Sequence, residues 1–311
     1  MAEKLDLWQM KWIAKAVVQK AISFLPFKHH VNYLFQKHIT KGVLLTDSYF
    51  NAKFEHFKSH IKYFQKYSKQ SFPETVLELG TGWYPIIPLS FFLLGSKVIY
   101  TVDISSLLKP EHLLATIKMF LAYIDKNPTN EFDKNRIQVL EDIVSKEQLH
   151  SLDELLSLLH ITYEVRDASD LPMKDNAIDF IVSNNTFEHI HEQALVGILS
   201  EFNRIKKKDG LMSHFIDMSD HFAHFDSKIT IFNFLKFSGF SWKLIDNSVQ
   251  PQNRLRIVEF RKMYADLEIE IILEENNVGR ESDIESITLS KKYQTMDQSD
   301  VLVSHSYLIS K

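Results

Sequence analysis

A glycine turn that follows a short apolar run is the first feature with chemical meaning. Residues 76–83 read Val-Leu-Glu-Leu-Gly-Thr-Gly-Trp and lead into an apolar helical pattern. Glycine permits a tight turn and lets the backbone approach a ligand closely, at the sheet edge where open α/β folds bind ligands. Such a turn also occurs in loops that only connect elements, so it needs further support. The first candidate cofactor contacts are Glu78, Gly80, Thr81, Gly82 and Trp83.

Two aspartates support a nucleotide-like ligand at this turn. Asp103 ends the next β-branched run 21 residues after Gly82, close to the roughly 20-residue interval at which an acid meets a ribose in nucleotide-binding α/β units. Asp167 ends a third run, where its carboxylate could accept a hydrogen bond from an adenine amino group. Taken singly, Asp103 also fits a helix N-cap and Asp167 a surface turn. The ordered set of three strand ends favours one adenosine site.

Histidines supply candidates for proton transfer. His189 follows a fourth run, and imidazole is the side chain whose unperturbed pKa lies nearest neutrality. It also fits a helix-start histidine that packs on the sheet. His221 and His224 lie in the stretch 217–226, whose oxygen and imidazole groups could hold a divalent metal, supply a base or form a plain polar loop. We predict His189, His221 and His224 as catalytic residues. Because the spacing of the stretch 217–226 matches no metal-ligand signature, we predict no metal ligand.

The elements that carry these residues alternate between strand and helix patterns. Short β-branched runs occur at residues 75–79, 97–104, 161–167, 177–185 and 210–217. Helical patterns separate them at 85–95, 107–124 and 192–208. The last ends in a lysine-rich turn before Gly210, which suits a helix C-terminus. The alternation predicts an α/β fold, with a parallel sheet and helices on both faces.

Additional segments flank and interrupt this alternation. Residues 1–70 contain two aromatic-rich helical patterns and predict an N-terminal helical cap on a domain of residues 71–311. Residues 134–160 predict a helical insertion, longer than a minimal crossover requires. Residues 217–265 are expected to add contacts for a substrate.

The residues described so far resemble the motif series of class I S-adenosylmethionine-dependent methyltransferases. The likeness rests on residues 78–83, Asp103, Asp167 and the stretch 183–190, Ser-Asn-Asn-Thr-Phe-Glu-His-Ile. It is best over residues 72–220. The resemblance implies a Rossmann-like sheet of seven strands, mostly parallel with an antiparallel edge strand. The alternating runs at 267–274 and 300–309 would be its sixth and seventh strands.

The resemblance also implies S-adenosylmethionine as the cofactor and a role for each matched position. Glu78 and the backbone of residues 80–82 would face its methionine part, and Asp103 its ribose. Asp167 and Ala168 would face its adenine. The remaining expected cofactor contacts are Ile104 and Asn184.

Trp83 departs from the family, which often has a third glycine at this position. Its ring is expected either to form a wall of the cofactor site or to fill space against the N-terminal cap. The same region bears on an alternative, a nicotinamide-dependent oxidoreductase. A dinucleotide fingerprint needs glycine or alanine at residue 85, where pyrophosphate binds a helix N-terminus, whereas Pro85 removes a backbone donor. A noncatalytic protein of the same fold, acting as a scaffold, is the other alternative that the sequence leaves open.

The resemblance is closest to the branch that modifies small molecules, such as quinone precursors, in which a Glu-His pair follows the fourth strand. We therefore expect a small-molecule, saccharide-linked or lipid-linked acceptor, methylated at oxygen rather than at carbon or nitrogen. The fourth strand lacks the Asn/Asp-Pro-Pro-aromatic motif of enzymes that methylate nucleobases or glutamine. Arg254 and Arg256 could bind an acidic or sugar-linked acceptor, or could lie in a solvated loop.

Composition narrows the partners and the compartment. A net charge of -4, with both signs spread along the chain, supplies no broad basic surface, so we expect no nucleic-acid partner. The chain has no cysteine, which excludes thiolate chemistry and agrees with a reducing compartment; we expect the cytoplasm. Lys11, Lys15 and Lys20 interrupt the apolar N-terminal stretch, so it is too polar to span a membrane. It could touch a membrane surface, or pack over the active site. No oligomeric state is predicted.

Overall fold

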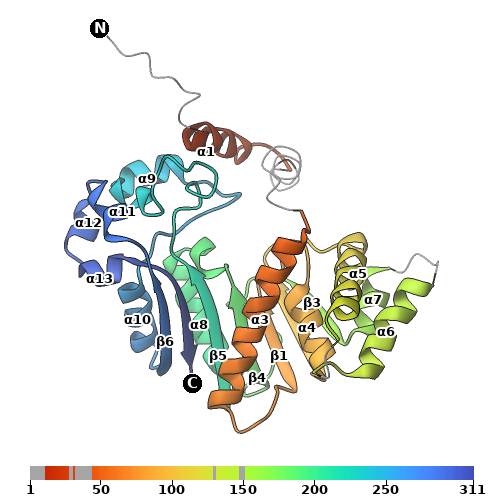
Figure 1. Ribbon diagram of the computed structural model, residues 1–311. Coiled ribbons are helices and arrows are strands. Elements are labelled where there is room, and N and C mark those ends of the chain that lie inside the picture. The colour runs from red at the N-terminus through yellow and green to blue at the C-terminus, as the bar shows by residue number, and fades with distance from the viewer. Residues whose placement is uncertain (1–10, 28–30, 32–43, 129–130, 147–150) are drawn as a thin grey trace.

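One mixed sheet organises the molecule. The computed structural model describes residues 11–27, 31, 44–128, 131–146 and 151–311. Within these residues the sheet has seven strands in the order β3-β2-β1-β4-β5-β7-β6 (Figure 1). The strands are β1 (Thr75–Leu79), β2 (Val98–Asp103), β3 (Ile161–Val165), β4 (Ile178–Asn184), β5 (Lys206–Asp217), β6 (Ile271–Val278) and β7 (Val303–Ser310).

Strands β1 to β5 run in one direction and end at one edge of the sheet. β1 pairs in parallel with β2 on one side and with β4 on the other. β7 is antiparallel to both β5 and β6, so the antiparallel strand lies one place inside the edge. The predicted fold class, a Rossmann-like seven-stranded sheet flanked by helices, is confirmed. Strand order reverses between β1 and β4, which is the place where open α/β sheets bind ligands.

Helices α3 (Asp47–Tyr67), α4 (Ile86–Leu94) and α5 (Pro110–Lys126) cover one face of the sheet (Figure 1). The α3 helix begins where the side chain of Thr46 accepts a hydrogen bond from the backbone N–H of Tyr49. Its buried side chains recur at helical spacing, so one apolar stripe faces the sheet. They are Phe50, Phe54, Phe57, His60, Ile61, Tyr63 and Phe64.

Helices α6 (Lys134–Ser145) and α7 (Leu152–Leu158) extend the same layer between α5 and β3. They occupy the stretch for which the sequence predicts a helical insertion. Leu140 of α6 and Leu155 of α7 are buried in the hydrophobic cluster that also includes Ile99 of β2. The domain boundaries themselves stay a prediction.

The opposite face of the sheet is covered by α8 (Glu192–Ile205) and α10 (Ile257–Asp266). Successive strand residues point to opposite faces. Val76 of β1 therefore packs beneath α3 and α4, whereas Leu77 packs against the side of α8 and α10. Both faces being covered explains why all seven residues of β4 are buried.

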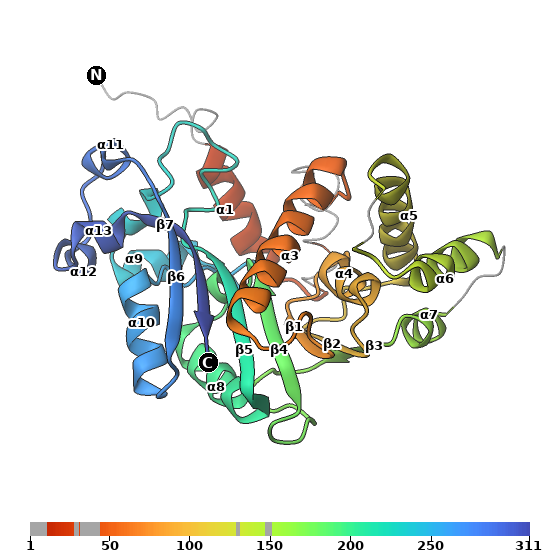
Figure 2. The same ribbon diagram turned by 60° about the horizontal axis from the view of Figure 1, so that its bottom comes forward.

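A third hydrophobic cluster lies outside the sheet and joins the N-terminal helix to the C-terminal half. Trp12 of α1 (Lys11–Ile22) packs against Phe222 and Phe237, with ring centroids 5.9 and 5.8 Å apart. The short helices of this region are η4 (Asn233–Lys236), α9 (Gly239–Ile245), α11 (Glu281–Glu285), α12 (Lys291–Gln294) and α13 (Gln298–Val301). Figure 2 shows α1 on the side of α9 and α3 across the sheet from α8.

The α8 helix ends at Ile205, and the lysines after it begin β5 instead of closing the helix, so the prediction of a lysine-rich helix end is wrong. Lys207 pairs with the buried Asp179 at 2.8 Å, which favours the extended conformation there.

Parts of the expected N-terminal cap, residues 1–10 and 32–43, lie outside the described residues. Across the described ranges, every helix is too short or too polar to cross a lipid bilayer.

Candidate active site

A cavity of about 590 Å³ lies at the carboxyl ends of β1, β2 and β4. Small-molecule sites in proteins typically measure roughly 300–1,000 Å³. The turns after β1, β2 and β3 form one side of the cavity. Tyr49 and Lys53 of α3 and the segment 248–251 line other parts of it. The predicted cofactor contacts that line it are Glu78, Gly80, Thr81, Gly82, Trp83, Asp103, Ile104, Asp167, Ala168 and Asn184.

The glycine turn after β1 has the backbone conformation that the sequence suggests. Gly80 and Gly82 have φ values of 89° and 64°, in the left-handed region that favours glycine. The N–H of Gly80 donates to Val102 O at 2.8 Å, which fixes the turn to β2. The turn therefore presents bare backbone to the cavity.

Asp103 joins the glycine turn to the end of β2. Its Oδ2 accepts a hydrogen bond of 3.0 Å from the N–H of Gly82, and its Oδ1 accepts one of 3.0 Å from the N–H of Ser105. Burial raises the pKa of Asp103, although these backbone donors oppose the shift. Each oxygen keeps a further lone pair for a ligand, so the carboxylate can hold a pair of hydroxyl groups without losing the turn.

Glu78 is buried at the end of β1, facing the same cavity. Thr101 donates a hydrogen bond of 2.8 Å to its Oε2. Burial raises the pKa of Glu78 to about 8, while Thr101 and the charge of Lys53 oppose the rise. A buried acid is stabilised when a cationic group lies beside it, so Glu78 is suited to a ligand that carries a positive charge.

The far end of the ligand site is more open. Asp167 is exposed and its Oδ1 accepts a hydrogen bond of 2.9 Å from the N–H of Ser169, whereas Ala168 is buried. Ile104 is 72% exposed, so its side chain is available to cover a flat ring. Trp83 lines the cavity with its ring edge-on to His112 of α5, the centroids 5.5 Å apart. The individual roles of these four residues stay predictions.

Lys53 and Tyr49 are cavity residues that the sequence analysis missed. The Nζ of Lys53 donates a hydrogen bond of 2.9 Å to Oδ1 of Asn185, in the turn after β4. Burial lowers the pKa of Lys53, while the charges of Glu188, Glu78 and Asp217 oppose the shift. A signal was present, because Lys53 stands between Phe50 and Phe54 on the apolar stripe of α3, where a charged residue needs a buried partner.

Asn184 is held at the end of β4 by a second residue of α3. His60 donates through Nε2 to the side-chain oxygen of Asn184 at 2.9 Å, and its Nδ1 lies 2.6 Å from Oγ of Ser213. Burial lowers the pKa of His60 to about 4, so the ring is neutral near pH 7. Among the described residues, none bonds the amide nitrogen of Asn184, which is therefore available to a ligand in the cavity.

The three predicted catalytic histidines do not share one position. His189 lines the cavity, and its ring lies 4.9 Å from that of His221, measured between centroids. His221 lines a smaller neighbouring pocket and forms an ion pair with Asp217 at 3.3 Å. His224 is exposed, with Nε2 3.2 Å from Oγ of Ser219. His189 and His221 are thus brought together, and His224 lies apart from the cavity-lining residues.

The pKa values of the two adjacent histidines are shifted in opposite directions. Burial and the charge of His221 lower the pKa of His189 to about 4. Burial also opposes charging of His221, but its bond to Asp217 and the charges of nearby acids raise its pKa overall. Glu188, next to them and 2% exposed, has its pKa raised to about 8 by burial and by the charge of Asp217. This corner of the site therefore brings together several ionisable groups that are largely buried.

Both alternatives considered for Arg254 and Arg256 are wrong. Each guanidinium is buried, so neither side chain lies in a solvated loop. Arg256 donates to the backbone carbonyls of Met218, Val301 and Val303. Arg254 donates to the carbonyls of Phe234 and Phe237 at 2.8 and 2.7 Å. These arginines stabilise the C-terminal segments, because buried carbonyls need hydrogen-bond donors. Neither arginine lines the cavity.

Comparison with protein families identifies the central part of the chain. Residues 128–213 match a family model described as "Methyltransferase domain". The matched residues include β3, β4, α8 and the turns that carry Asp167 and His189. The match confirms the resemblance predicted from the sequence, and with it the enzyme class and S-adenosylmethionine as the cofactor.

Solved structures similar to the chain are distant. They include a SAM-dependent methyltransferase from Methanosarcina mazei, with a TM-score of 0.43 and 13% identity, over 80% of this chain and 95% of the other. Geranyl diphosphate C-methyltransferase from Streptomyces coelicolor has a TM-score of 0.42 and 13% identity, over 82% of this chain and 78% of the other. Magnesium protoporphyrin IX methyltransferase from Synechocystis has a TM-score of 0.43 and 11% identity, over 82% and 81%. At TM-scores below 0.5, such likenesses add nothing about this chain. No curated protein matches it.

Proposed function

Taking the chain as a methyltransferase that uses S-adenosylmethionine, we propose that it methylates an oxygen atom of a small-molecule, saccharide-linked or lipid-linked acceptor. This proposal rests on the residues that line one cavity. The Gly80–Gly82 turn and Asp103 line it, and so do Lys53 and His189. The first group suits the cofactor and the second suits an acceptor that must lose a proton.

The cofactor's charge fits the first group of residues. The sulfonium and ammonium groups of S-adenosylmethionine are positive, and Glu78 is a buried acid at the glycine turn that such a charge would stabilise. In this proposal Asp103 accepts hydrogen bonds from the ribose hydroxyls, and Asp167 accepts one from the adenine amino group. A nicotinamide dinucleotide suits the turn less well, since its pyrophosphate would meet Glu78 and the donor-free Pro85.

The transfer itself is a displacement at the methyl carbon. An oxygen lone pair of the acceptor forms the O–CH₃ bond as the S–CH₃ bond breaks, and sulfur keeps the electron pair of the broken bond. The acceptor's proton must leave, and in this proposal Lys53, whose pKa is lowered by burial, accepts it. The protein's main task is to align acceptor and methyl group, because the donor is already activated by its charge.

The walls of the cavity favour a partly apolar small molecule. Ile190, Val249 and Pro251 line the cavity, and the carbonyl of Pro251 accepts a hydrogen bond of 2.6 Å from Nδ1 of His189. Arg254 and Arg256 are occupied elsewhere, so recognition of an acidic group by either is not part of the proposal. The cytoplasmic location and a membrane contact through the N-terminal residues stay predictions.

Ligand-dependent thermal stability tests the cofactor site first. A ligand at about 100 times its dissociation constant adds roughly 2.7 kcal/mol to the free energy of unfolding. We expect S-adenosylmethionine and its demethylated product to stabilise the wild type, NADH to have no effect, and Asp103→Ala to lose the response. No stabilisation by the sulfonium cofactor, or an equal response to NADH, would contradict the proposal.

A second experiment tests the reaction and separates an enzyme from a noncatalytic scaffold. The protein is incubated with cofactor carrying a labelled methyl group and with pools of hydroxylated small molecules, saccharides and lipid extracts. We expect label to enter a product whose methyl group is lost under ether-cleaving conditions. A product labelled at carbon or nitrogen would overturn oxygen as the target. Cofactor binding with no labelled product from any pool would favour the scaffold.

A further inference from the structure

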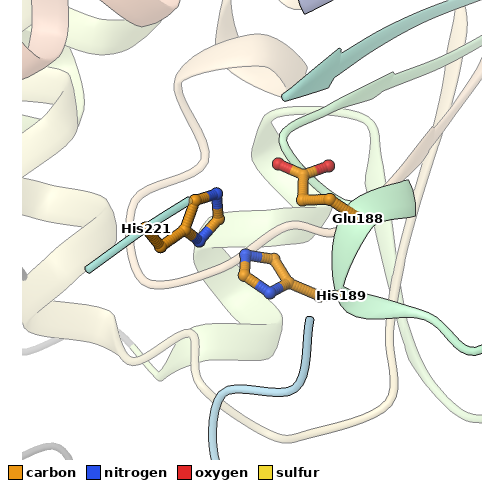
Figure 3. Close-up of side chains that lie close together, drawn as sticks. All are labelled: Glu188, His189 and His221. Carbon is orange, nitrogen blue, oxygen red and sulfur yellow. The ribbon is translucent and has the colours of Figure 1, made fainter. Parts of the chain in front are cut away.

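The side chains of Glu188, His189 and His221 form a compact group of potential metal ligands. Each offers one ligand atom, and these atoms all lie within 4.8 Å of one another. Figure 3 shows the two imidazoles with a nitrogen of each turned toward the other ring, and the carboxylate of Glu188 beside them. Two atoms bound to one zinc ion at about 2.0–2.2 Å are at most ~4.4 Å apart. The group is therefore near the separation that one cation requires.

Glu188 lacks the partners that a buried acid needs. Its side chain is 2% exposed, and no other described residue gives either carboxylate oxygen a hydrogen bond. Buried polar groups are nearly always paired, because an unpaired one loses its hydration without compensation. A cation between Glu188 and the two imidazoles would supply the missing partner.

Each histidine of the group is already oriented as a metal ligand. Nδ1 of His189 donates to the backbone carbonyl of Pro251 at 2.6 Å, which leaves Nε2 with its lone pair. Nε2 of His221 faces Oδ2 of Asp217 at 3.3 Å, which leaves Nδ1. A carbonyl or carboxylate on the far nitrogen is the usual arrangement behind a metal-bound imidazole, because it fixes the tautomer and the ring orientation.

We propose that Glu188, His189 and His221 bind one divalent transition-metal cation of the zinc type. Two imidazoles and one carboxylate are donors that such cations prefer, whereas magnesium prefers oxygen ligands alone. The sequence did not predict this site, since Glu188 and His189 are 32 or more residues from His221 along the chain. Under this proposal His189 and His221 are ligands rather than bases.

The place of the group suggests what the cation does. His189 also lines the cavity, as Asn184 and Ile190 do, so the cation would lie at the cavity wall. Three protein ligands leave a fourth position open for an oxygen of the acceptor, whose proton becomes more acidic on binding. This role rests on the proposed function, with Lys53 taking the proton that the hydroxyl releases. Metal binding itself does not depend on it.

Titration of chelator-treated, full-length protein with Zn²⁺ in a calorimeter tests the site, with metal content measured after dialysis. We expect one zinc ion per chain, and binding at least about 100-fold weaker in Glu188→Gln and His221→Ala. Asp217→Asn, which removes the charge of the carboxylate behind His221, should weaken binding about 10–100-fold. His224→Ala is the matched control, because this histidine lies 5.6 Å from His221 between ring centroids but outside the group; it should bind as the wild type does. Mg²⁺ should bind far more weakly than Zn²⁺.

The outcomes separate this site from the proposed function. Failure of the wild type to bind zinc stoichiometrically, or equal binding by Glu188→Gln, would overturn the site. Thermal melting of each variant excludes unfolding as the cause, and the conservative Glu188→Gln replacement keeps the test valid if His221→Ala is unstable. Zinc binding without stabilisation by S-adenosylmethionine would leave the site standing and remove the proposed function. Stabilisation by S-adenosylmethionine without zinc binding would overturn the cation site alone.

Discussion

The side chain of Thr186 lies against the α-carbon of Gly80, so that the turn after β4 touches the turn after β1. A β-carbon at Gly80 would lie 3.2 Å from Cβ of Thr186 and closer still to its hydroxyl. That hydroxyl donates to the backbone carbonyls of Leu79 and Asn184, at 3.2 and 3.1 Å. The contact fixes the two strand ends that form the floor of the cavity, and it explains why residue 80 is glycine.

Gly80→Ala should therefore lower both stability and cofactor affinity. The substitution adds a steric overlap with Thr186 to the strain of a φ of 89°, and such positions cost about 1–3 kcal/mol each. Urea unfolding and calorimetric titration with the demethylated cofactor measure the two effects. Gly239→Ala, where a β-carbon meets no atom of the described chain within 4 Å, is the matched control. Equal effects of the two substitutions would show that the Thr186 contact is unimportant.

Glu78 should make stability fall as pH rises toward 8. Its folded pKa is about 8 because of burial, against an ordinary value of 4.5, so between these values the folded state holds a proton that the unfolded state has lost. Folding stability then decreases with pH through this window, by about 1.4 kcal/mol for each pH unit at most. Lys53 and Asp103 are the charged groups that face Glu78, with opposite effects on its pKa.

Glu78→Gln should abolish this part of the pH dependence. Relative to the wild type, the variant is expected to gain stability steadily between about pH 4.5 and pH 8 and no further above that. The comparison cancels the histidines, which titrate equally in both proteins. A difference that stays constant with pH would show that Glu78 is already ionised in the folded protein.

Lys53→Met should impair methyl transfer more than cofactor binding. Loss of a general base typically costs about 10²–10⁴-fold in rate, whereas the ribose and adenine contacts stay in place. Turnover of the acceptor found by methyl labelling gives the rate, and calorimetry gives the affinity for the demethylated cofactor. Lys62→Met, an exposed lysine on the same helix, should change neither. A normal rate in Lys53→Met would assign the proton to another acceptor.

Arg256→Met should destabilise the fold without touching the cavity. It strips the donors from three buried carbonyls, and each unsatisfied group costs about 1–3 kcal/mol, so we expect a loss of about 3 kcal/mol or more. Arg280→Met is the control, because the arginine side chain of its ion pair with Asp283 is 82% exposed and the pair should contribute little to stability. Urea unfolding measures both. A small loss at Arg256 would mean that water replaces the guanidinium.

The sequence by itself determined the α/β fold, the glycine turn and the order of the strand-end acids. These features are local: a β-branched run specifies a strand, glycine specifies the left-handed turn after β1, and an acid at the end of the next strand must reach the same sheet edge. The last two strands, at 271–278 and 303–310, also followed from their alternating pattern, within a few residues.

Only the tertiary structure decided which distant side chains share an environment. Lys53 meets Asn185 because α3 crosses the sheet, and Arg256 is buried because three carbonyls of other segments converge on it. His221 joins Glu188 and His189, whereas His224, only three residues further along, faces solvent. Residue type and spacing along the chain do not specify these contacts, because each contact depends on how separate elements pack. Packing in turn sets the burial and the neighbouring charges that give a side chain its chemistry.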